Sequence, residues 1–172
     1  MILKGKGVQT EVTAEVLCNK QEAFDVLKAG GYQLTTELKM IDHYFTKLVV
    51  DKKIKYEQLI NNSFLLRDLR EGGFSNKLLM YKQKKFDKEG NVIAEQKVQT
   101  KVFDIEKAKE VFKLSGLHNW VIKKATIYVF EKDDLNCCLQ DIDGLGLYLE
   151  VEQQSHQTGS GKKIFNELVE YA

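Results

Sequence analysis

The sequence predicts a single α+β domain over residues 1–172 in which antiparallel strands predominate. Two observations support this prediction. The order strand, helix, then several strands occurs twice along the 172 residues, and neither a linker nor a low-complexity segment separates the halves. Several segments alternate apolar and polar residues, as half-buried strands do. Two halves of this kind favour an antiparallel-rich domain over a doubly wound parallel sheet.

The first half begins with a strand and a capped helix. We expect the strand over residues 8–17, where apolar residues are frequent. Asn19 is a plausible N-cap, and Glu22 stands where the acid of a capping box would be. Gly30-Gly31 follows an apolar helical stripe and is typical of a helix end.

Three further segments complete this half. A strand over residues 40–50 places Asp42 and Tyr44 on one face. Residues 51–62 are polar and lysine-rich, and we interpret them as a connection. Residues 63–84 predict a β-hairpin around two adjacent glycines.

The second half repeats this order. Asp104 is a good N-cap for a helix that ends at Gly116. A short amphipathic helix is expected over residues 160–171. The strands of this half are predicted at residues 92–103, 120–131, 135–141 and 147–153.

Composition and missing motifs exclude several classes of function. Lysine and arginine number 26 and aspartate and glutamate 25, which predicts no general affinity for nucleic acid. Three cysteines, two of them adjacent, do not make a disulfide framework and fit a reducing cytoplasm, which we expect as the location. We find neither a membrane span nor a signal-peptide pattern. Phosphate loops, dinucleotide fingerprints, zinc spacings and catalytic triads are also missing from the sequence.

The segment from Cys137 to Glu152 predicts a hairpin that carries acids. Glu150 and Glu152 alternate with apolar residues and project from one face, and Asp141 precedes the glycine turn. Three carboxylates brought together in this way are a candidate site for a hard cation such as Mg²⁺. The alternative is that these acids line the solvated face of an ordinary half-buried hairpin.

Basic residues recur in other strands. Arg67 and Arg70 lie in the first arm of the predicted hairpin, Lys82 lies in the second arm, and Lys123 opens a strand of the second half. Arginine forks and lysine point charges suit polyphosphate oxygens. A solvated strand face is the alternative interpretation of each base taken alone.

These residues together resemble a known family. Residues 139–152, LQDIDGLGLYLEVE, are similar to the signature of the CYTH domain, the triphosphate tunnel fold, which unites class IV adenylate cyclases with thiamine and inorganic triphosphatases. The matching positions are Asp141, Leu145, Gly146, Tyr148, Glu150 and Glu152. Residues 40–45 resemble the family's Asp-x-Tyr-Phe strand, and Arg67 and Lys82 match its basic strands.

The resemblance implies an antiparallel sheet closed into a tunnel, with helices outside. Inside it, Arg67, Arg70, Lys82 and Lys123 would hold a small-molecule triphosphate, and no nucleic acid or membrane partner is expected. Mg²⁺ or Mn²⁺ would be bound by Glu11, Asp141, Glu150 and Glu152. The substrate would then be hydrolysed or cyclised; the catalytic residues and the oligomeric state, a homodimer included, stay open.

The sequence departs from the family's pattern at several positions. The N-terminal Glu-x-Glu-x-Lys is replaced by residues 11–15, where Thr13 takes the place of an acid and Glu15 that of the lysine. Leu69 replaces the second arginine of an Arg-x-Arg pair, unless a bulge intervenes. Lys97 replaces an acid, and Ala125 replaces an arginine. These changes keep two alternatives open: a binding module that has lost turnover, and a structural, partner-binding domain whose tunnel is plugged by apolar side chains.

Overall fold

The computed structural model describes residues 10–88, 92–133 and 135–153. Their eight strands form one antiparallel sheet in the order β1-β8-β7-β6-β2-β3-β4-β5. The helix predicted over residues 160–171 lies outside the described residues, as does the expected start of the first strand at residue 8. In chain order the elements are β1 (Thr10–Val16), α1 (Lys20–Ala29), β2 (Gln33–Thr46), α2 (Tyr56–Asn61), β3 (Ser63–Glu71), β4 (Phe74–Phe86), β5 (Val92–Lys101), α3 (Ile105–Leu114), β6 (His118–Lys132), β7 (Leu135–Ile142) and β8 (Gly146–Gln153).

Two similar halves meet at the centre of the sheet. The long strands β2 and β6 pair with each other, and each follows a helix, α1 or α3. The halves also exchange their first strands, because β1 pairs with β8 of the second half and β5 pairs with β4 of the first. The predicted α+β fold, built from two strand-helix-strand halves, is confirmed.

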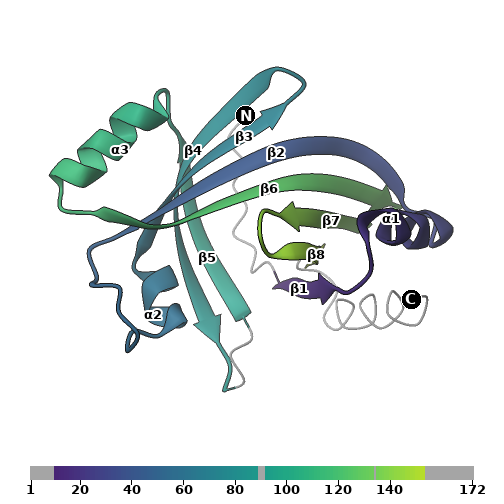
Figure 1. Cartoon of the computed structure of the whole chain (residues 1–172), viewed down its shortest axis with the longest axis horizontal. Helices are drawn as coiled ribbons and strands as arrows, with labels where there is room; N and C mark the ends of the chain where they lie inside the picture. The colour runs from purple at the N-terminus through teal and green to yellow at the C-terminus, as the bar shows by residue number, and fades with distance from the viewer. Residues whose placement is uncertain (1–9, 89–91, 134, 154–172) are drawn as a thin grey trace.

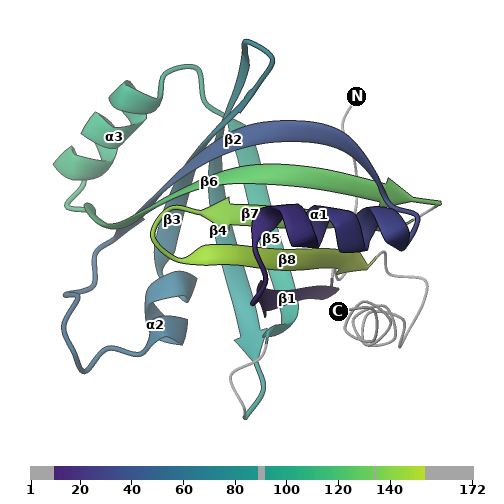
Figure 2. The same cartoon turned by 45° about the vertical axis from the view of Figure 1, so that its right-hand side comes forward.

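The sheet curls strongly about a hollow interior. Strand twist bends a wide antiparallel sheet in this way. In Figures 1 and 2, β2 and β6 arch over the other strands, and α1 and α3 lie outside the sheet. The curl brings Cα atoms of the edge strands β1 and β5 within 8 Å of each other, although no ladder joins the two strands in the described part of the chain.

The helices bury apolar side chains on the outer face of the sheet. α1 begins with the predicted capping box, in which Asn19 and Glu22 bond each other's backbone N–H. Its buried residues Ala23 and Leu27 pack on the outer face of β6, β7 and β8, where Phe130 is fully buried. On the other side, α3 contacts the outer face of β2, β3 and β4 (Figure 2). The outer face therefore holds much of the apolar core and leaves the inner face for polar groups.

The structure corrects two boundaries in the first half. The strand predicted over residues 40–50 begins at Gln33 and ends at Thr46. The segment interpreted as a connection contains α2, so that prediction was wrong. Tyr56, Leu59 and Ile60 stand at helical spacing. The helix has only six residues, so this apolar pattern is too short to be distinguished from the polar residues around it.

We predict that Phe130→Ala destabilises the fold by about 3–5 kcal/mol, because it removes a fully buried ring and leaves a cavity. Denaturant unfolding followed by circular dichroism measures the change. Phe103→Ala is the matched control: its side chain is fully exposed, and the expected change is within about 0.5 kcal/mol. Equal effects of the two substitutions would contradict the placement of Phe130 in the buried core.

Among the described residues, no helix combines the length and the apolar character that crossing a membrane requires.

Candidate functional site

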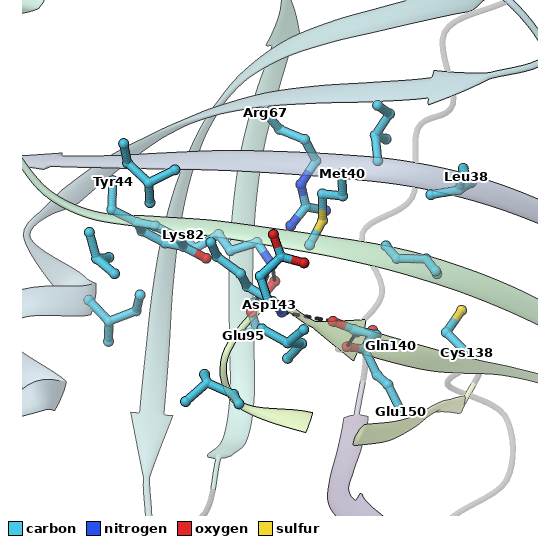
Figure 3. Close-up of a pocket in the computed structure, with 18 of the residues that line it drawn as sticks. Leu38, Met40, Tyr44, Arg67, Lys82, Glu95, Cys138, Gln140, Asp143 and Glu150 are labelled. Atoms are coloured by element: carbon cyan, nitrogen blue, oxygen red, sulfur yellow. Dashed lines mark hydrogen bonds and ion pairs between the residues drawn. The ribbon is translucent and has the colours of Figure 1, made fainter. Parts of the chain in front are cut away.

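A cavity of about 530 Å³ occupies the inner face of the curled sheet. Side chains from seven strands, β2 to β8, and from α2 line it. Figure 3 shows Arg67, Lys82, Glu95, Gln140 and Glu150 in this single space, although their positions in the chain lie far apart. The cavity is thus built by the fold and not by any local motif.

Asp42 and Arg67 form a buried ion pair in the wall. They are register partners on β2 and β3, and the guanidinium donates from Nε to Oδ1 at 2.7 Å and from Nη2 to Oδ2 at 2.6 Å. Asp42 is fully buried, whereas the Arg67 side chain is 23% exposed. Burial by itself would lower the pKa of Arg67, but the hydrogen bonds and charge of Asp42 outweigh it and raise the pKa. The pair fixes the guanidinium and uses two of its five N–H donors.

A second group joins β4 and β5. Glu95 lies between Lys82, whose Nζ is 3.1 Å from Oε1, and Lys84, whose Nζ is 3.3 Å from Oε2. Burial of Glu95 by itself would raise its pKa, but the two ammonium groups more than compensate and lower it below the ordinary value. One carboxylate therefore holds two lysines side by side, and the group keeps a net positive charge.

A third group joins β6, β7 and β8. Lys123 Nζ donates to Gln140 Oε1 at 2.7 Å, and Gln140 Nε2 donates to Glu150. Gln140 is buried, and its amide bridges a base and an acid. Figure 3 shows the carboxylate of Asp143, from the turn between β7 and β8, near the first of these bonds.

The described lining of the cavity is rich in bases. It contains five basic side chains, Arg67, Lys82, Lys84, Lys97 and Lys123, and three acidic ones, Glu95, Asp143 and Glu150. A concave site with an excess of one charge and low-dielectric walls concentrates ions of the opposite charge. The cavity is therefore suited to a small polyanion.

Four of the residues predicted from sequence line this cavity. They are Arg67, Lys82, Lys123 and Glu150. The resemblance implied that the late acid Glu150 and the mid-chain base Lys82 face one interior, and both line this cavity. The backbone of β1 pairs Glu11 with Glu152 of β8, but the side chains of both lie outside the described part of the structure.

Arg70 and Asp141 do not line the cavity. Arg70 bonds Asp68 at 2.7 Å, with its side chain 61% exposed, and β3 keeps its register without a bulge, so Leu69 takes the inner position. Asp141 is adjacent to the inward-facing Gln140 on β7, so its side chain points to the other face. There its Oδ2 lies 3.9 Å from Nζ of Lys20 in α1. Both residues therefore belong to the opposite face of the sheet from Glu150.

Sequence reasoning missed several lining residues. Lys84 and Gln140 were not singled out, nor was Asp143. A signal for Gln140 existed: with a three-residue turn over residues 143–145, the ladder places Gln140 opposite Tyr148, on the same face as Glu150. Lys84 follows Lys82 at a spacing of two and therefore shares its face.

Apolar side chains fill one side of the interior. Met40, Ala125, Ile127 and Ile142 form a buried cluster, and Leu69 packs against it. Two of the departures from the family's pattern, at positions 69 and 125, thus fall in this cluster. The interior combines a charged side with an apolar side.

The described residues provide only part of a metal site. Glu150 is the one predicted ligand that lines the cavity, and no group of three histidine, cysteine, aspartate or glutamate side chains comes together in residues 10–88, 92–133 and 135–153. The β1–β8 ladder does pair Glu11 with Glu152 and Thr13 with Glu150. A site for a hard cation at this end of the sheet would therefore need the acids at 11 and 152.

The curled antiparallel sheet and its basic interior resemble the triphosphate tunnel fold. No protein-family model matches the chain. It is 25% identical over 163 residues to a Methanocaldococcus jannaschii protein that is named provisionally as an adenylate cyclase; the match covers 95% of this chain and 86% of that one.

Solved structures share the fold. The PH1819 protein of Pyrococcus horikoshii superposes with a TM-score of 0.75 at 16% identity, over 95% of this chain and 90% of that one. A Hippeastrum protein, a candidate adenylyl cyclase described as having a dominant triphosphatase activity, gives 0.59 at 12% identity, over 95% and 86%. These comparisons confirm the resemblance to the CYTH, or triphosphate tunnel, family.

We predict that Glu95→Gln lowers stability at neutral pH, because it leaves Lys82 and Lys84 adjacent without their shared anion. The folded pKa of Glu95 lies below its ordinary value of 4.5, so its ionised form stabilises the fold above that pH. The contribution is lost as the pH falls through the lower, folded pKa. Thermal unfolding at a series of pH values should show the wild-type advantage shrinking below pH 4.5.

Glu71→Gln, at the exposed end of β3, is the control and should change stability little at any pH. A wild-type advantage over Glu95→Gln that persists unchanged in acid would contradict the assigned role of the Glu95 charge.

Proposed function

We propose that the protein binds a small-molecule triphosphate in the inner cavity and, with a divalent metal ion, hydrolyses or cyclises it. The observation that carries this proposal is the convergence of Arg67, Lys82, Lys84 and Lys123 on one cavity. The names of two similar proteins, a candidate adenylate cyclase and a candidate cyclase with triphosphatase activity, support the same substrate class.

The bases have distinct roles in this proposal. Arg67 is oriented by Asp42 and would present its remaining N–H donors to phosphate oxygens as a rigid fork. Lys82 and Lys84, on the neighbouring strand β4, would act as a pair of point charges. Both hydrolysis and cyclisation depend on holding the chain of phosphates in line and on neutralising its charge.

The metal would be Mg²⁺ or Mn²⁺, held by Glu150 together with Glu11 and Glu152. Carboxylate oxygens are the ligands that such hard cations prefer. Bound there, the ion would supply charge neutralisation and activate the attacking oxygen. Gln140 bonds both Glu150 and Lys123, so it would orient the carboxylate relative to the phosphate-binding bases. Asp141 and Arg70 are left out of the proposed site because they lie on the outer face.

A binding module without turnover is the second candidate. Leu69 and Ala125 stand where the family's pattern has arginines. Thr13 stands where the pattern has an acid, and it is the register partner of Glu150 in the β1–β8 ladder. Fewer charges around the phosphates would weaken transition-state stabilisation more than ground-state binding. Calorimetry that shows tight binding of tripolyphosphate or ATP by a protein without turnover would favour this candidate.

The structural alternative, by contrast, requires a tunnel plugged by apolar side chains, whereas the described interior holds a cavity lined by five bases.

We expect release of phosphate or pyrophosphate from at least one of tripolyphosphate, thiamine triphosphate and ATP when Mg²⁺ or Mn²⁺ is added. The product distinguishes the reactions, because ATP cyclisation releases pyrophosphate and hydrolysis of the terminal phosphate does not. A folded protein that turns over none of the three would refute the enzymatic proposal.

We expect Lys82→Met to reduce kcat on the order of 10²-fold, since losing one preorganised electrostatic contact costs about 3 kcal/mol in the barrier. Lys85→Met is the matched control, because Lys85 lies on the same strand but is exposed and does not line the cavity. Steady-state kinetics with the preferred substrate measures both variants. Equal losses would remove Lys82 from the proposed site.

A further inference from the structure

One end of the cavity is aromatic and apolar. Its wall comes from the end of β2, the start of β6, α2 and the turn between β7 and β8. The side chains that form this wall, here called the aromatic end, are Tyr44, Tyr56, Ile60, Trp120, Val121 and Leu145. Tyr44 is two residues from Asp42 on β2 and shares its face, next to the Asp42–Arg67 pair, so the aromatic end adjoins the bases.

Several of these side chains are exposed in a way that a folded protein usually avoids. Tyr56 is 60% exposed, Val121 37% and Leu145 65%. Single exposed apolar residues are ordinary, but a set that converges on one cavity marks a binding surface. The described structure provides no side chain to cover them, whereas a bound organic group would do so.

Trp120 is fixed within this wall. Its indole Nε1 donates to Ser63 Oγ at 2.8 Å, and Ser63 Oγ donates in turn to the carbonyl of Leu59 at 2.6 Å. The Tyr44 ring lies beside the indole, with 5.9 Å between ring centroids. An aromatic surface that is already ordered loses little conformational entropy when a flat ring stacks on it.

The aromatic end is also tied to the bases. Asn61 at the end of α2 bonds the backbone of Lys84 twice, donating to its carbonyl at 2.8 Å and accepting from its N–H at 2.7 Å. The Tyr81 hydroxyl donates to the carbonyl of Asn61 at 2.8 Å. α2, which carries Tyr56, is therefore held against the strand that carries Lys82 and Lys84, so a single ligand can span both parts.

We propose that the aromatic end binds a flat heteroaromatic ring attached to the triphosphate, so that the substrate is an organic triphosphate and not inorganic tripolyphosphate. This inference rests on the proposed function of the same cavity. The phosphates occupy the basic part, and the ring lies against Trp120 and Tyr56. Stacking on an aromatic side chain contributes on the order of tenfold or more in affinity.

The experiment compares ligands that share the phosphates and differ in the organic group. ATP, GTP, thiamine triphosphate and tripolyphosphate are titrated into the full chain in metal-free buffer, where turnover is held off. Trp120 is the single tryptophan of the sequence, so its fluorescence reports on the aromatic end. We expect quenching by the organic triphosphates whose ring stacks there and much less by tripolyphosphate.

Substitutions then separate the two parts of the site. Tyr56→Ser, at an exposed position where folding is not at risk, should weaken binding of the preferred organic triphosphate about tenfold and leave tripolyphosphate binding unchanged. Leu145→Ser, in the exposed turn between β7 and β8, should act in the same direction. Phe74→Ser, also exposed but at the start of β4 and outside the cavity lining, is the matched control and should change neither.

The outcomes distinguish failure of the proposed ring subsite from failure of the proposed triphosphate site. If tripolyphosphate and the organic triphosphates bind with equal response to Tyr56→Ser and Leu145→Ser, the aromatic end is not a subsite, while the triphosphate site itself stands. If none of the four ligands binds to the folded protein, either in metal-free buffer or with Mg²⁺ added, the proposed function fails and the subsite with it. The preferred ring among ATP, GTP and thiamine triphosphate identifies the organic group.

Discussion

Charged side chains can share the interior of a curled sheet only when each is partnered, because a buried unpaired charge is costly. The fold meets this requirement in three groups that lie on different strands. Asp42 holds Arg67, Glu95 holds two lysines, and Gln140 connects Lys123 to Glu150. In the first two groups the partner fixes the base without consuming all its hydrogen-bonding capacity. The interior stays basic and ordered at the same time.

The apolar core beneath the outer helices offsets the free-energy cost of placing charges in the interior. α1 and α3 bury aromatic and aliphatic side chains on the outer face, and a further apolar cluster fills one inner side. Hydrophobic burial is the main stabilising contribution in folding and offsets the desolvation of the interior charges. The two repeated halves also meet along β2 and β6, so residues from both halves necessarily face one cavity.

Much of this arrangement was predictable from the sequence because it follows from alternation. Glu150 faces inward with Tyr148, and Lys82 faces inward on β4, as the period of two requires. The same rule explains what was misplaced. Asp141 is one residue from Gln140, and Arg70 is three from Arg67; an odd separation along a strand moves a side chain to the opposite face.

Other features did not stand out in the sequence. Gln140 carries no charge and stood out in no motif, yet it joins two charged residues across three strands. The helix α2 is short and lies among lysines, but its Asn61 determines where the aromatic end of the cavity stands relative to the bases. Such contacts depend on the curled shape of the sheet, which pattern and propensity do not specify.

The central claim is that bases and acids from distant strands act on one triphosphate inside the sheet. A crystal structure of the protein soaked with tripolyphosphate and Mn²⁺ tests it most directly. The account predicts phosphate oxygens within hydrogen-bonding distance of Arg67, Lys82 and Lys123, with Mn²⁺ beside Glu150. Phosphate bound only on the outer surface, with the inner cavity lacking both phosphate and metal, would contradict it.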